Sequence, residues 1–180
     1  MDRPEQTGYH VDRLLLRLPA AATIGIYMSA LRLKIPPVAV VILTALLMWV
    51  LAHAAPTLQF TLSGKWVVAV VFATAGVLVA VMGVATFRNA RTTVNPLQPH
   101  TTSALVTSGA YRVTRNPMYL GMLLVLFGWA VALANPLTLV GSIAFILYMN
   151  RYQIAPEEAA LTGLFGRSYL DYQRAVRRWL

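Results

Sequence analysis

Two groups of polar residues stand at the two ends of one long uncharged stretch. The first is the segment GAYRVTRNPMYLG at residues 109–121, which contributes two arginines, one asparagine and two tyrosines. The second is the pair Glu157 and Glu158, where the chain becomes polar again. Guanidinium and amide groups bind carboxylates, whereas carboxylates bind ammonium groups and hydroxyls. Together the two groups suit a small zwitterion held at a membrane surface, and no packed apolar core requires them.

The composition is that of an integral membrane protein. Hydrophobic residues make up 58% of the 180-residue chain, charged residues 12%, and the mean hydropathy is +0.62. Soluble domains are about one quarter charged. We therefore predict a single membrane-embedded domain over residues 1–180, in which any chemistry takes place within the membrane domain itself.

The residue types exclude several other functions. There is no cysteine, so disulfides, thiolate nucleophiles and cysteine metal sites are excluded. His10, His53 and His100 lie in three different segments, so no histidine metal cluster is expected. The net charge of +9 is carried beside apolar spans, which indicates anionic lipid headgroups and membrane topology instead of nucleic acid.

Charge-free windows predict the first two membrane spans. Residues 36–54 are nearly all apolar, and residues 66–87 carry no formal charge. About 20 residues of helix are needed to cross the hydrocarbon core. Only helices are expected here, because an open sheet would leave backbone groups unpaired in hydrocarbon.

A helical hairpin is predicted to follow. The uncharged stretch between Arg115 and Arg151 is interrupted at Asn135-Pro136. Proline lacks an N–H and disfavours helix in the preceding residue, so a tight turn is expected between spans at residues 117–134 and 136–152. The predicted fold class is an all-α integral membrane protein with about four transmembrane helices.

The lysines and arginines predict the orientation. In a four-span arrangement only Lys65 falls on one side, and the other fourteen of the 15 basic residues fall on the opposite side. The positive-inside rule then places both termini and the central loop, residues 88–114, in the cytoplasm. The expected location is the inner (cytoplasmic) membrane, with a multi-pass topology.

The N-terminal segment leaves a fifth span open. Residues 14–31 are apolar enough to be considered, but they carry Arg17 and Pro19 near their start. A span there would also move two further basic residues to the outside. We therefore expect residues 1–34 to form an interfacial or partly inserted segment.

The residues after Pro156 predict an amphipathic helix, bent near Gly163 and Gly166. Apolar residues recur there at steps of three and four, and its polar side carries Arg167, Asp171, Arg174, Arg177 and Arg178. Such a helix is expected to lie on an anionic leaflet and to act as a lid over the mouth of the hairpin.

The ordered combination of motifs resembles a known family. The string LVTSGAYRVTRNPMYLG at residues 105–121, the Asn135-Pro136 turn, the Glu157-Glu158 pair and the string LFGRSYLDYQRAV from Leu164 closely resemble the isoprenylcysteine carboxyl methyltransferase family and its phospholipid methyltransferase relatives. The resemblance covers residues 86–176, about half of the chain, and implies a cofactor-binding catalytic core at residues 86–180. One departure is Asn116, which stands where the eukaryotic enzymes have histidine. Asparagine can still hydrogen bond there but cannot titrate near neutrality.

The resemblance implies methyl transfer from S-adenosylmethionine to a lipophilic acceptor, expected to be a carboxylate of an isoprenoid or prenylcysteine-like compound. An ionised carboxylate needs no general base, so binding and alignment would supply most of the catalysis. The implied partners are a lipophilic small molecule or prenylated substrate, together with membrane lipids. Three alternatives stay open: a phospholipid amine methyltransferase, an NADPH-dependent membrane reductase and a non-catalytic membrane assembly factor. The reductases usually carry a glutamate soon after the motif tyrosine, where this chain has Leu120-Gly121-Met122.

The resemblance also implies roles for individual residues. Asn116 and Tyr119 would hold the carboxylate end of the cofactor, and Glu157 and Glu158 its ammonium or ribose. Arg115 would orient the anionic acceptor, so that Arg115 and Glu158 are the candidate catalytic residues. The remaining candidate cofactor contacts are Leu105, Val106, Thr107, Gly109, Tyr111, Pro117 and Gly121, with the backbone of residues 105–109 on the adenine.

Each assignment has a structural alternative. Arg112 and Arg115 could serve as topology anchors, and the two tyrosines could belong to an interfacial aromatic belt. The two glutamates could simply favour a helix N-terminus. Glycines on the second and third predicted spans are more often close-packing positions than cofactor contacts; they are Gly76, Gly83, Gly121 and Gly128.

Overall fold

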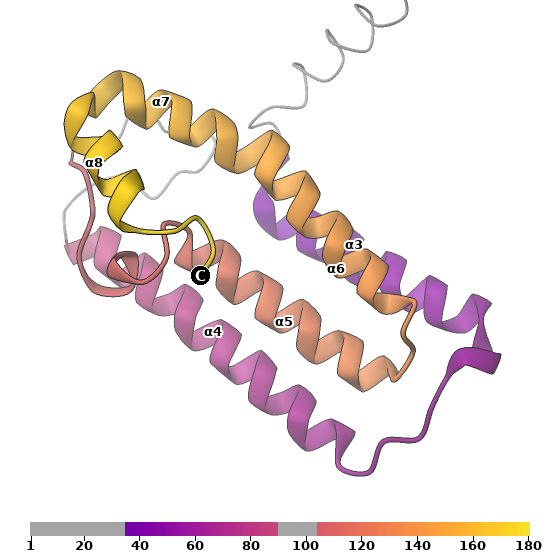
Figure 1. The fold of residues 1–180 in the computed structure, drawn as a ribbon. Coiled ribbons are helices and arrows are strands. Elements are labelled where there is room, and N and C mark those ends of the chain that lie inside the picture. The colour runs from indigo at the N-terminus through magenta and orange to yellow at the C-terminus, as the bar shows by residue number, and fades with distance from the viewer. Residues whose placement is uncertain (1–34, 90–103) are drawn as a thin grey trace, which may run out of the picture.

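The computed structural model describes residues 35–89 and 104–180 (Figure 1). The predicted interfacial segment at residues 1–34 and most of the central loop, residues 90–103, lie outside the described residues. The described residues form helices and connecting turns, in the order α3 (Pro37–Ala54), η1 (Pro56–Leu58), α4 (Lys65–Asn89), η3 (Gly109–Arg112), α5 (Pro117–Leu133), α6 (Thr138–Tyr148), η4 (Met149–Ile154), α7 (Ala155–Phe165) and α8 (Arg167–Ala175). The predicted all-helical architecture is confirmed for this part of the chain.

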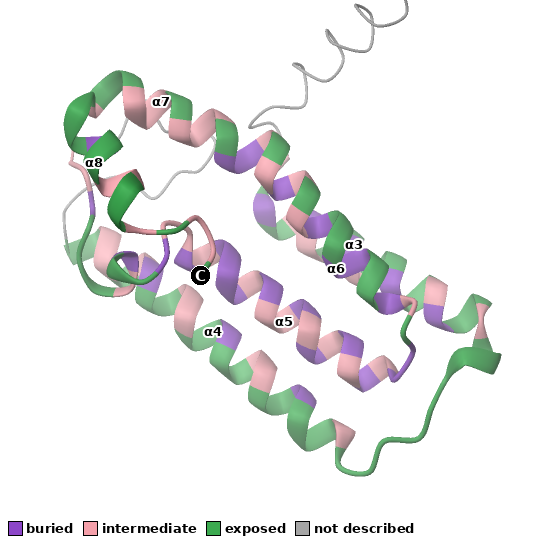
Figure 2. Cartoon of the chain, viewed as in Figure 1, coloured by how far each residue is buried: buried purple, intermediate pink, exposed green. Residues whose placement is uncertain are grey.

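Two of these helices, α3 and α4, are long and apolar enough to cross a membrane. Their most apolar windows have mean hydropathies of 2.2 and 2.7, yet only 28% and 17% of those windows is buried inside the protein. Figure 2 shows the consequence as exposed residues along α4, and α3 also has exposed positions along its length. Exposed apolar surface on this scale is expected where lipid replaces water. The helices match the spans predicted at residues 36–54 and 66–87.

Glycines allow α4 and α5 to pack in close contact. A Cβ atom added at Gly121 would lie 2.4 Å from the carbonyl oxygen of Gly76, and one added at Gly76 would lie 2.5 Å from the carbonyl oxygen of Gly121. At Gly128 the added atom would lie 2.7 Å from the carbonyl oxygen of Ala69. Small residues let membrane helices approach this closely. The predicted packing role of the glycines is therefore confirmed, and Gly121 faces α4.

The turn predicted at Asn135-Pro136 is present and is fixed by the asparagine side chain. Helix α5 ends at Leu133, and Ala134 adopts a left-handed conformation with φ of 47°. Asn135 Nδ2 donates to the carbonyl oxygen of Ala55 at 2.9 Å, and Asn135 Oδ1 accepts from the N–H of Leu137 at 3.0 Å. These bonds satisfy the buried amide and hold the α5–α6 hairpin against the end of α3.

The fourth predicted span does not stop at Tyr152 as a separate helix. Helix α6 continues through the π-helical segment η4 into α7 without leaving helical backbone angles. Pro156 lies in the first turn of α7, directly after the wider π-helical turns, where its missing N–H is most easily tolerated. One continuous helical path thus carries the chain from the hairpin turn to Glu157 and Glu158.

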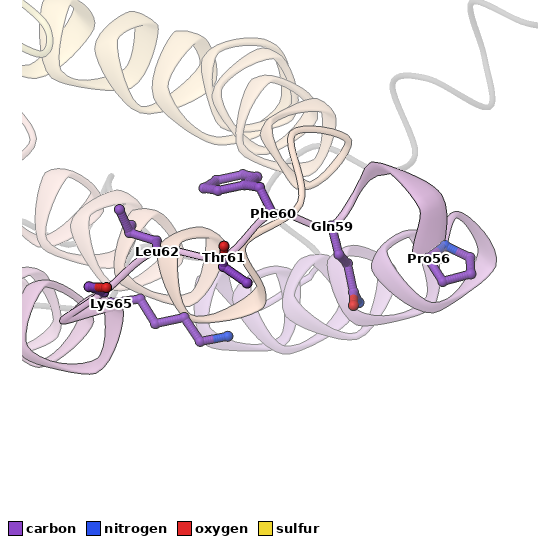
Figure 3. Close-up of a pocket in the computed structure, with 7 residues that line it drawn as sticks. Pro56, Gln59, Phe60, Thr61, Leu62 and Lys65 are labelled. Carbon is purple, nitrogen blue, oxygen red and sulfur yellow. The ribbon is translucent and has the colours of Figure 1, made fainter.

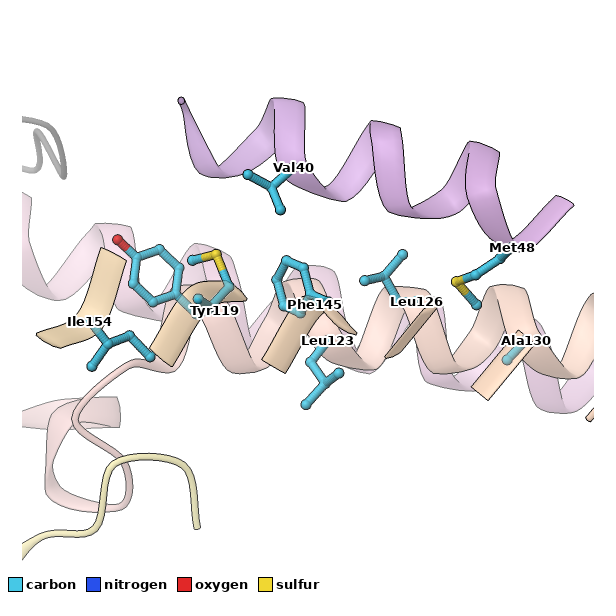
Figure 4. Packing of buried hydrophobic residues seen from close by; sticks show 9 residues of the cluster. Val40, Met48, Tyr119, Leu123, Leu126, Ala130, Phe145 and Ile154 are labelled. Carbon is cyan, nitrogen blue, oxygen red and sulfur yellow. The ribbon is translucent and has the colours of Figure 1, made fainter. Parts of the chain in front are cut away.

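The core lies between α3, α5 and α6 (Figure 4). Its buried side chains include Met48 of α3, Leu126 of α5 and Phe145 of α6. Tyr119 belongs to the same cluster and lies at one end of it, beside Ile154. The end of the apolar core therefore adjoins the first polar site residue.

The chain reverses direction at the end of α7. Gly166 has φ of 52°, a backbone conformation that favours glycine, and α8 begins at the next residue. The predicted bend is confirmed at Gly166, whereas Gly163 lies within α7. Figure 1 shows α8 and residues 176–180 returning over the N-terminal end of α5. This return brings the last described residues to the site.

Candidate functional site

The N-terminal end of α5 is held by short-range contacts. Gly109 has φ of 57°, and a Cβ atom there would lie 2.8 Å from Thr86 Oγ1 of α4, so glycine is required on both grounds. The buried Thr114 side chain accepts a hydrogen bond from the N–H of Asn116 at 3.2 Å. Pro117 then begins the helix, where a missing N–H costs nothing. Residues 109–117 are thereby fixed against α4 and α5.

Tyr119 and Glu157 join α5 to α7. The Tyr119 hydroxyl donates a hydrogen bond to Glu157 Oε1. Burial raises the pKa of Glu157 from 4.5 to about 8, the Tyr119 hydrogen bond lowers it, and the nearby charge of Glu158 raises it further. Glu157 is therefore a carboxyl group that gains or loses its proton close to neutral pH.

Glu158 binds two arginines from distant parts of the chain. Arg178 donates to it twice, from Nε to Oε1 at 3.1 Å and from Nη2 to Oε2 at 2.5 Å. Arg115 Nη1 lies 3.0 Å from Glu158 Oε1. The Glu158 hydrogen bonds raise the pKa of Arg178. The two guanidinium groups and one carboxylate leave this cluster with one net positive charge.

Arg115 retains hydrogen-bonding capacity within this cluster. Its side chain is 13% exposed, and among the described residues neither Nε nor Nη1 finds a partner for an aligned hydrogen bond. The short Nη1 contact with Glu158 is thus an ion pair without hydrogen-bond geometry. Buried N–H groups of a guanidinium are costly to leave unpaired, so Arg115 is suited to bind an additional anionic oxygen.

The segment at residues 176–180 closes over the start of α5. The carbonyl oxygen of Arg177 accepts from the N–H of Arg115 at 2.9 Å. The carbonyl oxygen of Arg178 accepts from Asn116 Nδ2 at 2.9 Å and from Thr114 Oγ1 at 3.1 Å. Trp179 Nε1 donates to Asn150 Oδ1 of the π-helical segment at 3.1 Å. The predicted covering of the hairpin mouth is therefore made in large part by this segment.

Tyr111 packs between α4 and α8. It is buried, its ring contacts Phe87 edge to face at 5.1 Å between centroids, and its carbonyl oxygen accepts from the Tyr172 hydroxyl at 2.7 Å. Burial raises the pKa of Tyr111, so the phenol stays neutral. These contacts differ from those of an interfacial aromatic belt.

The structure brings most of the predicted site residues together. Glu157 and Glu158 contact Tyr119 and Arg115 directly, while Asn116 and Pro117 lie between those two residues in the chain. Gly121 is apart from this group, in the α4–α5 interface. The stretch at residues 105–107 is an irregular segment that leads into η3, with Val106 buried and Thr107 exposed.

Sequence reasoning missed Arg178 and Thr114 as site residues. Helical periodicity assigned Arg178 to the polar face of a helix lying on the membrane, but α8 ends at Ala175 and Arg178 leaves the helix. No local pattern indicates that the residues after Ala175 return to the start of α5, so the sequence carried no signal for these two contacts.

A pocket of about 590 Å³ lies away from this site (Figure 3). It is formed by the α3–α4 connection and lined by Pro56, Gln59, Phe60, Thr61, Leu62, Ser63 and Lys65. The N–H of Phe60 bonds to the carbonyl oxygen of Ala134, at the C-terminal end of α5. Helix α5 has 17 residues and rises 1.5 Å per residue, so its two ends are about 25 Å apart. The pocket and the glutamate cluster are therefore at opposite ends of α5.

Metal ligands are not grouped in the described residues. Within residues 35–89 and 104–180, no set of three or more histidine, cysteine, aspartate or glutamate side chains is placed to hold a metal ion. The arrangement instead offers paired charges of both signs, and this donor set suits a zwitterionic or anionic organic ligand.

The chain matches known proteins over part of its length. A family model described as phospholipid methyltransferase matches residues 64–168, more than half of the chain. A probable protein-S-isoprenylcysteine O-methyltransferase from Oryza sativa subsp. indica is 39% identical over 79 residues, which are 42% of this chain and 40% of the relative. A protein-S-isoprenylcysteine O-methyltransferase from Xenopus laevis is 40% identical over 72 residues, 40% of this chain and 25% of the relative.

A further relative, from Haemophilus influenzae, has no assigned function. It is 49% identical over 63 residues, which are 35% of this chain and the whole length of that protein. By contrast, the matched region spans 40% or less of the Oryza and Xenopus methyltransferases.

Proposed function

Because this chain belongs to the phospholipid methyltransferase family, whose members use S-adenosylmethionine, we propose that it is an integral membrane methyltransferase acting on a lipophilic acceptor. The proposed acceptor group is a carboxylate of an isoprenoid or prenylcysteine-like compound, as in the names of the relatives. The observation that carries the proposal is the meeting of two motifs. Arg115 and Tyr119, from the start of α5, contact Glu158 and Glu157, from the start of α7.

The residues present fit S-adenosylmethionine. Its amino acid end carries a carboxylate and an ammonium, and the site offers groups of both signs within a few residues. Glu157 is the carboxyl group whose hydrogen-bonded partner is a neutral phenol, so its deprotonated form is available to an ammonium or to ribose hydroxyls. Asn116, whose amide keeps a second N–H beside the one given to Arg178, would hold the carboxylate end, and Tyr119, whose single O–H is donated to Glu157, would position that carboxyl group. Residues 105–109 would lie along the adenine. When bound, the cofactor supplies a methyl group already activated by the sulfonium.

Arg115 is the proposed acceptor-orienting residue. It is always charged, it is largely buried, and its Nε and Nη1 have no aligned partner within residues 35–89 and 104–180. A planar guanidinium can hold a carboxylate in a two-pronged geometry and so fix which oxygen faces the methyl group. An ionised carboxylate attacks without losing a proton, so alignment by Arg115 is the main contribution required.

The two ligands are proposed to arrive by different routes. The exposed apolar faces of α3 and α4 favour a lipid environment for these helices, and a lipophilic acceptor dissolves in lipid. The glutamate cluster lies beyond the apolar core, at the predicted cytoplasmic end, where a water-soluble cofactor is available. The acceptor would therefore enter from the bilayer and the cofactor from the cytoplasm.

Methylation of a phospholipid amine is a second candidate, and one observation favours it. An amine must lose a proton before or during methyl transfer, unlike a carboxylate. Glu157, with its pKa raised by burial to about 8, can accept a proton at physiological pH. The matched family description also names phospholipid methyltransferases.

Calorimetric titration of the purified protein in lipid nanodiscs tests the proposal. Binding of S-adenosylhomocysteine without binding of NADPH is the expected result. Binding of NADPH alone would support the membrane reductase instead. Binding of neither compound to folded protein would favour a non-catalytic assembly factor and contradict the proposed function.

A further inference from the structure

The contacts of Glu158 differ from those expected of a residue that holds a cofactor ammonium. Both of its carboxylate oxygens accept from Arg178, and one of them also lies 3.0 Å from Arg115. Its side chain is 14% exposed. A carboxylate already matched to two guanidinium groups has little remaining attraction for another cation.

The backbone reinforces this arrangement. The carbonyl oxygens of Arg177 and Arg178 accept hydrogen bonds from Arg115 N, Asn116 Nδ2 and Thr114 Oγ1. These hydrogen bonds anchor the peptide groups before and after the Cα atom of Arg178 to residues 114–116. Trp179 packs against the core cluster and bonds to Asn150, which fixes the next position along the chain. Arg178 is therefore held in place independently of Glu158.

We propose that Glu158 and Arg178 are positioning residues that hold the guanidinium of Arg115 toward an anionic group of the acceptor. This inference rests on the proposed function and changes the role of Glu158 within it, from a cofactor contact to a support for Arg115. The cluster keeps one net positive charge, so its ligand is an anionic oxygen group, either a carboxylate or a phosphodiester. Glu157, hydrogen-bonded to Tyr119, is left as the carboxylate available to the cofactor.

The test compares variants in nanodiscs with S-adenosylhomocysteine as the cofactor probe and two acceptor probes. The acceptor probes are N-acetyl-S-farnesylcysteine, which carries a carboxylate, and phosphatidylethanolamine, which carries a phosphodiester and an amine. Binding of S-adenosylhomocysteine to the unaltered protein is measured first. If the unaltered protein does not bind S-adenosylhomocysteine, the proposed function is wrong, whatever the variants do. If it does bind, the variants test the roles of Glu158 and Arg178 alone.

For whichever acceptor probe is methylated, Glu158→Gln and Arg178→Ala should each raise the KM by about tenfold or more. The Kd for S-adenosylhomocysteine should change by less than about threefold. Arg178→Lys should recover part of the loss, since it keeps the charge without the two-pronged geometry. Arg174→Ala is the matched control, because Arg174 is exposed and, in the part of the chain that the structure describes, pairs only with Asp171 on α8. It removes the same charge and should behave as the unaltered protein.

The two acceptor probes distinguish the sources of the anion. Turnover of N-acetyl-S-farnesylcysteine, with no competition by its uncharged carboxamide, assigns the site to a carboxylate. Turnover of phosphatidylethanolamine alone assigns it to a phosphodiester headgroup.

Four results would overturn the inference. The first is a tenfold loss of S-adenosylhomocysteine affinity in Glu158→Gln with an unchanged acceptor KM, which would make Glu158 a cofactor ligand. The second is equal competition by the carboxylate and its carboxamide. The third is an Arg178→Ala protein with unaltered KM and kcat. The fourth comes from thermal unfolding, which is followed for each variant in parallel. If stability and cofactor affinity fall and the acceptor KM rises in the same proportion in Arg178→Lys, Arg178 is a purely structural contact.

Discussion

Tyr119 and Glu157 are 38 positions apart in the chain and share a hydrogen bond from the tyrosine hydroxyl to Glu157 Oε1. The bond links the first turn of α5 to the first turn of α7, across the end of the apolar core. It depends on the uninterrupted path from α6 through the π-helical segment, because that path sets the rotational position of Glu157. The site is thus built where the two ends of the hairpin meet.

Cofactor affinity should depend on pH through Glu157. Burial raises the pKa of this carboxyl group to about 8, so the carboxylate form becomes populated as the pH rises. A cationic ligand group binds the carboxylate form, so the affinity for S-adenosylhomocysteine should increase by up to about tenfold per pH unit from pH 6 toward 8 and then level off. Calorimetric titrations across this range provide the measurement.

The Glu157→Gln variant separates this effect from titration of the ligand. It should bind more weakly at pH 8 and should lose the part of the pH dependence that belongs to the carboxyl group. If the unaltered protein and the variant show the same pH profile, Glu157 does not contact the cation.

The glycine interface between α4 and α5 should be intolerant of even one added methyl group. In Gly121→Ala the new Cβ would lie 2.4 Å from the carbonyl oxygen of Gly76, so the helices must move apart, at a cost of about 1–3 kcal/mol. Thermal unfolding in detergent should show a lowered midpoint. Gly163→Ala is the control, because a Cβ there meets nothing within 4 Å, and it should be neutral or stabilising. Equal midpoints for the two variants would mean that α4 and α5 do not pack as described.

The predicted topology can be tested with single cysteines, since the natural chain has none. Ser63 and Arg167 are both exposed, one in the α3–α4 connection and the other at the start of α8. A membrane-impermeant maleimide should label Ser63→Cys in intact cells and should label Arg167→Cys only after permeabilisation. Labelling of both positions from outside would contradict a cytoplasmic site.

The sequence was most informative where the bilayer and local chemistry determine the structure. Hydrophobic thickness and the position of charges predicted α3, α4 and the hairpin, because a membrane helix must be long, apolar and internally hydrogen-bonded. The Asn135-Pro136 turn was predicted from the missing proline N–H, and its buried asparagine bonds explain why it is so sharp. The grouping of Arg115 and Tyr119 with the two glutamates also followed from the order of the motifs.

Features that depend on long-range folding were not predicted. The direction of the chain after α8 decides that Arg178 reaches Glu158, and no local pattern encodes that direction. The rotational position of α5 decides that Gly121 packs against Gly76 of α4. The continuity of α6 with α7 was missed because Pro156 ordinarily indicates a helix start, and the π-helical turns before it accommodate the proline.

The central claim is that Arg115 orients the carboxylate of a lipophilic acceptor for methylation. The most direct measurement is transfer of a labelled methyl group from S-adenosylmethionine to N-acetyl-S-farnesylcysteine by the protein in nanodiscs, followed by base treatment. A methyl ester releases labelled methanol under base, whereas a methylated amine keeps its label. We expect base-labile product from the unaltered protein, and in Arg115→Lys a kcat/KM for the acceptor reduced by about a hundredfold with cofactor affinity nearly unchanged. Base-stable product on a lipid amine, or equal losses of turnover and cofactor affinity in Arg115→Lys, would contradict the claim.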